Sequence, residues 1–227
     1  MRPERLMNTL RAKDRRSARK ESKSMSRLTV FLIALGGLIA MTGLAVFLTL
    51  PGAQSDFPER ASGTPLIGGP FELVAHDGQT VTDETFKGAF TLIYFGFTYC
   101  PDVCPTELQV MSGALDLLGD DAEKVRPLLI TVDPERDTVD IMAQYVANFH
   151  PRLMGLTGTP EQISTAASAY RVYYEKVEDP GSNAAYTMDH SSVVYLMGPD
   201  GTFIAHFGPG TGSEKMAEKI KAAIDAS

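Results

Sequence analysis

Cysteine is scarce in this chain, since only Cys100 and Cys104 occur among its 227 residues. There is no third thiol for either of them to pair with elsewhere. The two can therefore form one local disulfide or hold one soft metal ion. The residues alone leave these two outcomes open, and choosing between them is most of the functional question.

Basic residues are also scarce after residue 50. The segment 51–227 has eleven Lys and Arg against twenty-five Asp and Glu, whereas residues 1–27 have ten Lys and Arg against three acidic residues. Nucleic-acid binding by the acidic part is not expected, because phosphate contacts need a basic face. The net charge of −7 hides this split between the two parts.

Charged residues are absent from 28–50, an apolar run that would be roughly 34 Å long as a helix. This length predicts a transmembrane anchor, because the apolar core of a cleaved signal peptide is about 7–15 residues and no A-x-A-like site follows closely. The basic arm 1–27 should stay in the cytoplasm and everything after Leu50 should be exported.

The arm's three acidic residues argue against a mitochondrial transit peptide. We therefore expect a bacterial inner-membrane protein with a periplasmic domain, with the mitochondrial inner membrane as the alternative. In either oxidising compartment the redox state of two spare thiols matters.

The rest of the chain divides into a linker, 51–65, rich in Pro, Gly and Ser, and a folded domain, 66–227. Apolar and β-branched runs predict strands at 71–74, 80–81, 90–97, 127–132, 154–156, 172–176, 192–197 and 202–207. Amphipathic segments predict helices at 107–118, 138–149, 160–170 and 213–224. This alternation predicts an α/β fold whose mixed central sheet has helices on both faces.

The cysteines follow the apolar strand 90–97, at the end where sites gather in such sheets. If Pro105 is the first helical residue, Cys104 caps the helix and the helix dipole lowers its thiol pKa. If the helix begins at Pro101, the two thiols lie one turn apart on the same face. Either geometry lets them act together.

His190 lies in a polar segment just before an apolar strand and could complete a site with two sulfur ligands and one nitrogen ligand. Asp189 is a candidate to orient its ring, because ligating histidines usually donate their second N–H to an acceptor. Taken alone, such a histidine is more often a surface residue. His76, His150 and His206 are expected to have core or surface roles.

The stretch from Val132 to Thr138 follows the other central strand and should lie beside the cysteine loop. Asp133 is a candidate to reach the site from the strand end. Asp137 is expected to be the N-cap of the helix that begins at Thr138.

Three stretches together resemble the Sco (SenC-like) family: FTYCPDVCP at 97–105, VDPERDT at 132–138 and DHS at 189–191. The resemblance covers the anchor and nearly all of 66–225. It implies a membrane-anchored, thioredoxin-like copper chaperone that receives copper from a donor chaperone and delivers it to the CuA centre of cytochrome c oxidase subunit II or to another acceptor. By this resemblance Cys100, Cys104 and His190 are the copper ligands. Two thiolates favour Cu(I) and an imidazole accommodates Cu(II), so one site suits both.

The rival hypothesis is a thiol–disulfide oxidoreductase that uses Cys100 and Cys104 as a redox pair to reduce the acceptor's cysteines or other exported thiols. Thioredoxin-type enzymes have a Cys-x-x-Cys dithiol and an opposing cis-proline, whereas this chain has three residues between its thiols and Asp189-His190 in that segment. A peroxidase is less well supported, because the Thr-x-x-Cys context of peroxiredoxins is missing. The first two functions are not exclusive.

Overall fold

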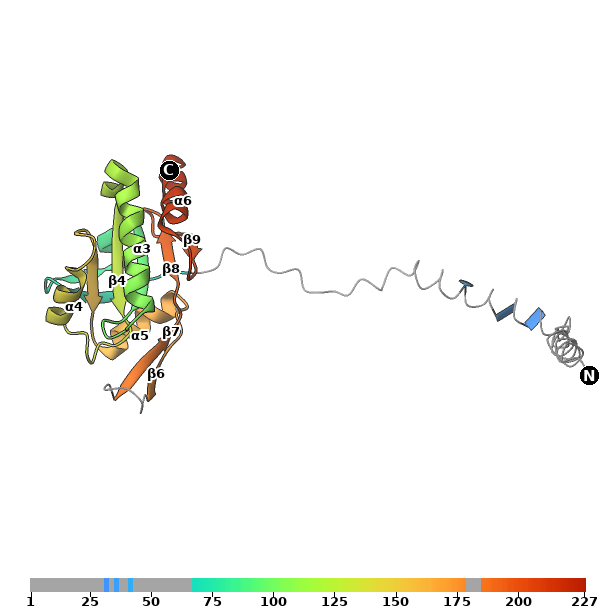
Figure 1. Ribbon diagram of the computed structural model, residues 1–227, viewed down its shortest axis with the longest axis horizontal. Helices are drawn as coiled ribbons and strands as arrows, with labels where there is room; N and C mark the ends of the chain where they lie inside the picture. Colours follow the sequence, from blue (N-terminus) through green and yellow to red (C-terminus); the bar gives the residue numbers. More distant parts are fainter. Residues whose placement is uncertain (1–30, 33–34, 37–40, 43–66, 179–184) are drawn as a thin grey trace, which may run out of the picture. The chain divides into compact units, whose positions relative to one another are not determined.

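The computed structural model describes residues 31–32, 35–36, 41–42, 67–178 and 185–227 (Figure 1). The chain forms two compact units, Met1–Ser62 and Gly63–Ser227, and the second carries the fold described below. The predicted arm and linker lie outside the described residues, as does the predicted span apart from three residue pairs. Among the described residues no helix is both long enough and apolar enough to cross a membrane.

The elements of the second unit alternate between strands and helices. The strands are β1 (Glu72–Ala75), β2 (Thr80–Thr82), β3 (Phe90–Gly96), β4 (Val125–Thr131), β5 (Met154–Thr157), β6 (Tyr174–Glu178), β7 (Tyr186–His190), β8 (Val194–Met197) and β9 (Phe203–Phe207). The helices are α3 (Val103–Leu118), α4 (Val139–Val146), α5 (Pro160–Ala169) and α6 (Ser213–Asp225), with short 3-10 helices η1 (Asp83–Phe86) and η2 (Gly119–Lys124).

The main sheet is mixed, as predicted, with the strand order β2-β1-β5-β4-β3-β8-β9. Strand β4 pairs in parallel with both β3 and β5, while β8 runs antiparallel to β3. Every residue of β3 is buried, which is what its continuous apolar run predicts for a strand covered on both faces.

Helices cover both faces of this sheet, which confirms the prediction (Figure 1). Neighbouring residues in a strand point to opposite faces. The Tyr94 hydroxyl lies 3.7 Å from the Cys104 sulfur on α3, whereas the ring centroid of Phe95 lies 5.5 Å from that of Tyr170 at the end of α5. Helices α3 and α6 pack against each other. The domain thus has a thioredoxin-like α/β fold.

A second, two-stranded sheet is formed by β6 and β7 and extends beyond the end of the main sheet as the orange hairpin in Figure 1. The sequence predicts a strand at 172–176 followed by a polar loop, whereas β6 begins at Tyr174 and β7 ends at His190. His190 is therefore on a strand and not in a loop. Strand β7 was not predicted, because its sequence contains no apolar run. Met188 is the only one of its five residues that is buried.

Helix α3 begins at Val103, with Asp102 as its N-cap residue. Both predicted starts, at Pro101 and at Pro105, are therefore wrong, and Pro105 lies inside the first turn. A proline fits there because the first N–H groups of a helix have no partner within the helix. Cys104 belongs to the helix, and Cys100 stands outside it.

At Gly96 the Cys104 side chain of α3 packs closely against β3. A methyl group added at this position would lie 2.8 Å from a ring carbon of Tyr94 and 3.1 Å from the Cys104 sulfur. Both side chains are fully buried, so neither can easily move away. The glycine therefore lets the cysteine sulfur rest directly on the strand.

We predict that Gly96→Ala lowers the free energy of unfolding by about 1–3 kcal/mol, the usual cost of overpacking a core. Urea unfolding of the full-length chain measures this loss. Gly208→Ala is the matched control, because a methyl group there meets no atom within 4 Å, and it should change stability by less than about 0.5 kcal/mol. Equal losses in the two variants would contradict the proposed close packing.

Candidate metal centre

Cys100 and Cys104 flank the start of α3, and both thiols are free in this structure. Cys104 is fully buried in the core, whereas Cys100 is half-buried at its edge. The pair therefore consists of one shielded sulfur and one accessible sulfur.

The Cys100 sulfur lies at the amino end of α3, where it accepts a hydrogen bond from the backbone N–H of Cys104 at 3.4 Å. The pKa of the Cys100 thiol falls to about 5, mainly because the Cys104 thiol hydrogen-bonds to it, and the N–H groups of Cys104, Asp102 and Val103 add to the effect against the opposing cost of burial. A helix amino terminus stabilises a thiolate in this way. The lowered pKa expected for a capping Cys104 therefore belongs to Cys100.

Cys104 has the opposite tendency. Its hydrogen bond to Cys100 and its burial raise the pKa of its thiol, so this sulfur keeps its proton while Cys100 is ionised. The Tyr94 side chain is fully buried, and its hydroxyl donates a hydrogen bond to the Cys104 sulfur at 3.7 Å. At a pH between these two pKa values the dithiol holds one negative charge, centred on the more accessible sulfur.

His190 reaches this pair from the end of β7. Its Nε2 lies 3.5 Å from the Cys104 sulfur, and its Nδ1 lies 3.3 Å from the carbonyl oxygen of Ser191. The imidazole ring packs edge-on against Tyr94 and Phe97, with centroid distances of 6.1 and 5.8 Å. Burial lowers the pKa of His190, which favours the neutral imidazole that a metal ion needs.

These positions suit a first-row transition metal. Ligand distances of about 2.3 Å for sulfur and 2.0–2.1 Å for nitrogen, at trigonal or tetrahedral angles, separate the two ligand atoms by about 3.6–3.8 Å. The separation of 3.5 Å between Cys104 and His190 is close to this value. In the described part of the chain no three His, Cys, Asp or Glu side chains are already gathered around a metal position. The Cys100 sulfur would therefore have to close on an ion held by the other two.

The two acidic candidates have other neighbours. Asp133 is buried, and its carboxylate accepts hydrogen bonds from Arg136 and, at 2.9 Å, from the Tyr186 hydroxyl. Asp189 is exposed and lies opposite Glu175 in the hairpin. The Ser191 carbonyl, and not the Asp189 carboxylate, faces the His190 Nδ1.

Asp137 is the residue that sequence reasoning assigned wrongly. The N-cap of α4 is Thr138, whose hydroxyl accepts from the Ile141 N–H, while Asp137 is fully buried. Its carboxylate accepts from the N–H and hydroxyl of Thr98, at 3.0 and 2.6 Å, and from the Thr131 hydroxyl at 2.6 Å. It therefore ties the cysteine loop to the end of β4.

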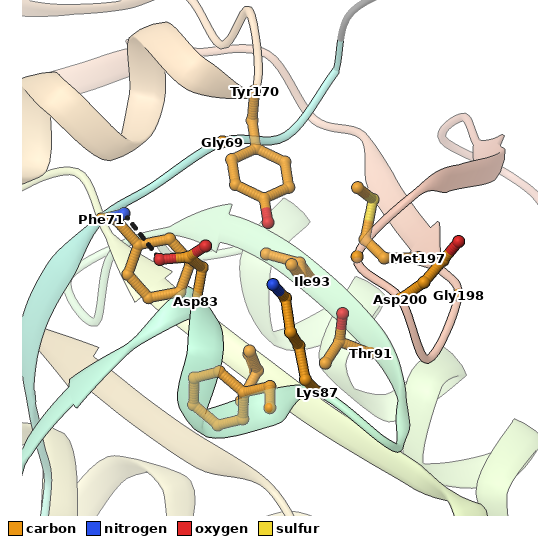
Figure 2. Close-up of a pocket in the computed structure, with 13 residues that line it drawn as sticks. Gly69, Phe71, Asp83, Lys87, Thr91, Ile93, Tyr170, Met197, Gly198 and Asp200 are labelled. Carbon is orange, nitrogen blue, oxygen red and sulfur yellow. Dashed lines mark hydrogen bonds between the residues drawn. The ribbon is translucent and has the colours of Figure 1, made fainter.

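A cavity of about 140 Å³ opens on the other face of the sheet (Figure 2). Tyr170, Asp83 and Lys87 point into it, and Thr91 and Ile93 of β3 form part of its wall (Figure 2). Its lining includes neither thiol and no candidate ligand. The candidate centre is thus not part of this cavity.

We predict that Cys100 in the reduced, metal-free chain is alkylated with a pH midpoint near its pKa of about 5. Iodoacetamide labelling between pH 4 and pH 9, followed by peptide mass spectrometry, measures this midpoint. Cys104→Ala should move it upward, because the thiol that stabilises the Cys100 thiolate is lost, and Cys104→Ser should move it less. A wild-type midpoint near 8.5, the value of a free cysteine, would contradict the prediction.

Comparison with known proteins gives consistent matches across the domain. A family model described as SCO1/SenC matches residues 59–225. The SCO1 homolog 1 of Arabidopsis thaliana is 48% identical over 149 residues, which are 65% of this chain and 44% of that protein. A SCO2-like protein of Rickettsia prowazekii is 34% identical over 202 residues, 88% of this chain and 98% of that protein. The chain spans about half the length of several curated relatives, including 54% of the human SCO1 homolog.

Solved structures match as well. The structure of Arabidopsis thaliana ScoI with copper bound has 43% identity and a TM-score of 0.67, covering 71% of this chain and 99% of that one. The structure of BsSco, a member of the Sco family of cytochrome c oxidase assembly proteins in which a disulfide switch was identified, has 25% identity and a TM-score of 0.57, covering 73% of this chain and 98% of that one. The family model covers most of this chain and the Rickettsia protein is matched over almost its whole length, so the chain belongs to the SCO1/SenC family.

Proposed function

We propose that this protein is a copper chaperone that binds one copper ion through Cys100, Cys104 and His190. The observation that carries the proposal is the meeting of His190 Nε2 and the Cys104 sulfur at 3.5 Å, beside a free Cys100 thiol. The copper-bound Arabidopsis relative supports the choice of metal. Two sulfurs and one imidazole are a donor set suited to copper in both oxidation states.

The local environment prepares the two sulfurs differently for the ion. Cys100 is already inclined to be a thiolate, while Cys104 must release its proton when a metal binds, as ligating thiols do. The Tyr94 hydroxyl can then donate to the negative Cys104 sulfur from the buried side. The two thiolates hold Cu(I), and His190 adds the nitrogen that Cu(II) needs.

Delivery of the ion requires a partner to reach it. Tyr99, which directly precedes Cys100, is 53% exposed, and Val103, three residues after Cys100, is 40% exposed. An exposed apolar pair next to the accessible sulfur suits a partner that exchanges its own thiolates for these ligands. We propose the CuA site of cytochrome c oxidase subunit II as the acceptor, or another thiolate acceptor, and a separate chaperone as the donor. The assembly role of the BsSco family supports this choice.

We propose that residues 1–27 are a cytoplasmic arm, 28–50 a membrane anchor, 51–65 a linker and 66–227 the exported domain in the periplasm. The charge split and the uncharged run of the sequence support this topology. Digestion of the domain by protease added to intact spheroplasts tests it, and full protection would contradict it.

A thiol–disulfide oxidoreductase is the second candidate. The observation that favours it is the asymmetry of the pair, since Cys100 is a half-buried thiolate and Cys104 a buried thiol beside it. This arrangement suits a nucleophile with a resolving partner. In this function Cys100 would attack the acceptor's disulfide and Cys104 would release the mixed disulfide.

We predict that the reduced full-length chain binds copper one to one, with thiolate-to-copper absorption. His190→Ala should keep Cu(I) binding but weaken Cu(II) binding by about 10- to 100-fold, because the only imidazole donor is removed. Anaerobic titration with competing chelators measures both affinities. His206→Ala is the matched control, because this histidine lies on β9 and contacts Phe203, away from the sulfurs.

Tight binding of both ions unchanged in His190→Ala would remove the histidine from the site. Failure of the wild-type chain to bind copper would refute the chaperone function. Reduction of a CuA-site disulfide under metal-free conditions would support the oxidoreductase, and a copper-dependent transfer without disulfide exchange would count against it.

A further inference from the structure

The hairpin that carries His190 is not part of the main sheet. Within the described residues, strands β6 and β7 pair only with each other, and Tyr174 lies opposite His190 in their register. A two-stranded hairpin is marginally stable on its own in water. The position of His190 must therefore be fixed by contacts between the hairpin and the domain.

Arg136, which follows β4, makes the central contact of this kind. Its Nη1 donates to the carbonyl oxygen of Tyr186 at 3.0 Å, at the first residue of β7. Its guanidinium also lies 3.8 Å from the centre of the Tyr186 ring. One side chain thus holds both the backbone and the ring of the residue that begins the strand of His190.

The same guanidinium faces the cysteine loop. It lies 4.9 Å from the ring centre of Tyr99 and 5.9 Å from that of Phe97, whose ring in turn packs edge-on against His190. Tyr99 directly precedes Cys100 in the sequence. The cation therefore stands between the loop that bears the sulfur ligands and the strand that bears the nitrogen ligand.

Asp133 holds the guanidinium in place. Its carboxylate, 3% exposed, accepts from Arg136 Nε and from the Tyr186 hydroxyl at 2.9 Å. Arg136, Asp133 and Tyr186 therefore form a closed triangle of hydrogen bonds and ring contact. The planar guanidinium can make these contacts at once, which an ammonium group cannot do with the same geometry.

Lys176 makes a second contact between the hairpin and the turn after β4. Its ammonium group lies 2.8 Å from the Glu135 carboxylate and 3.9 Å from the centre of the Tyr186 ring. Its side chain is 47% exposed and that of Glu135 is 62% exposed, so solvent weakens this pair. The Arg136 side chain is only 24% exposed. The triangle, which includes the buried Asp133 carboxylate, is therefore the stronger anchor.

We propose that Arg136 is a positioning residue that locks the β6–β7 hairpin against the cysteine loop. It thereby holds the His190 Nε2 close enough to the Cys104 sulfur for both atoms to bind the same metal ion. The inference rests on the proposed function for its copper consequence. Loss of the lock frees the imidazole, whereas the bonds of Asp137 to Thr98 still hold the cysteine loop in place. Binding of Cu(II), which needs the nitrogen, therefore depends on Arg136, and binding of Cu(I) by the sulfurs does not.

The test compares Arg136→Met with Arg152→Met in the full-length chain. Arg152 is a matched control, because its side chain is 21% exposed, it pairs with Glu123 at 2.7 Å, and it donates to the Val125 carbonyl at the opposite end of β4. Both arginines also have one buried nitrogen without a hydrogen-bond partner among the described residues. Each variant therefore removes a similar half-buried charge, and only one of them touches the hairpin.

We expect Arg136→Met to weaken the binding of Cu(II) by about 10- to 100-fold. The absorption and electron paramagnetic resonance spectra of its bound Cu(II) should approach those of His190→Ala. Its Cu(I) affinity should stay within about threefold of wild type, because both thiolates remain. Arg136→Lys should recover the Cu(II) signal only in part, and Tyr186→Phe, which loses only the bond to Asp133, should have an intermediate effect.

A copper-free measurement separates this inference from the proposed function. Backbone amides of 174–178 and 186–190 should exchange hydrogen at least about tenfold faster in Arg136→Met than in wild type or Arg152→Met. If wild type binds no copper but this exchange rises, the proposed function fails and the lock stands. Unchanged exchange and unchanged Cu(II) spectra in a folded Arg136→Met would overturn the inference. Equal effects of Arg136→Met and Arg152→Met would overturn it as well.

Discussion

The parallel pairing of β3 with β4 sets the position of everything around the sulfurs. Gly96 lies opposite Thr131, so the two strands end at the same level and the loops that follow them must run side by side. The Val132 N–H donates to the Gly96 carbonyl at 2.8 Å, which continues the pairing past the strand ends. Asp137 then binds Thr98 across the gap. A slip of one residue would turn Tyr94 away from Cys104 and dismantle the site.

Much of this arrangement can be predicted from sequence, because buried parallel strands are continuous apolar runs. The runs at β3 and β4 predict the core, and the cysteines and VDPERDT follow them directly. The less apolar β7 could not be predicted, since its pairing with β6 depends on tertiary contacts such as Arg136 with Tyr186. Asp137 stands just before a helix, where a capping residue is expected, so the sequence predicts a cap. Its contact with Thr98 joins residues far apart in the sequence and is visible only in the folded chain.

The two cysteines also show how much of a site's chemistry lies in tertiary surroundings. Four positions apart in sequence, they differ in the direction of their pKa shifts, because one sulfur stands before the helix and the other is packed beneath it. The resemblance to Sco proteins implies that both cysteines are ligands but says nothing of this difference. The difference in pKa arises because α3 begins at Val103. The free N–H groups of its first turn then face the Cys100 sulfur, and Cys104 is buried beside Gly96.

The unequal burial of the sulfurs has a consequence for damage by oxidants. A peroxide reaching the domain meets the Cys100 thiolate first and converts it to a sulfenic acid, with the peroxide reduced in the same step. The buried Cys104 thiol stands next to that group, and it can displace water from it to form a disulfide before a second peroxide produces the irreversible sulfinic acid. Because thiol reductants reverse a disulfide, such a disulfide would protect Cys100 from permanent loss.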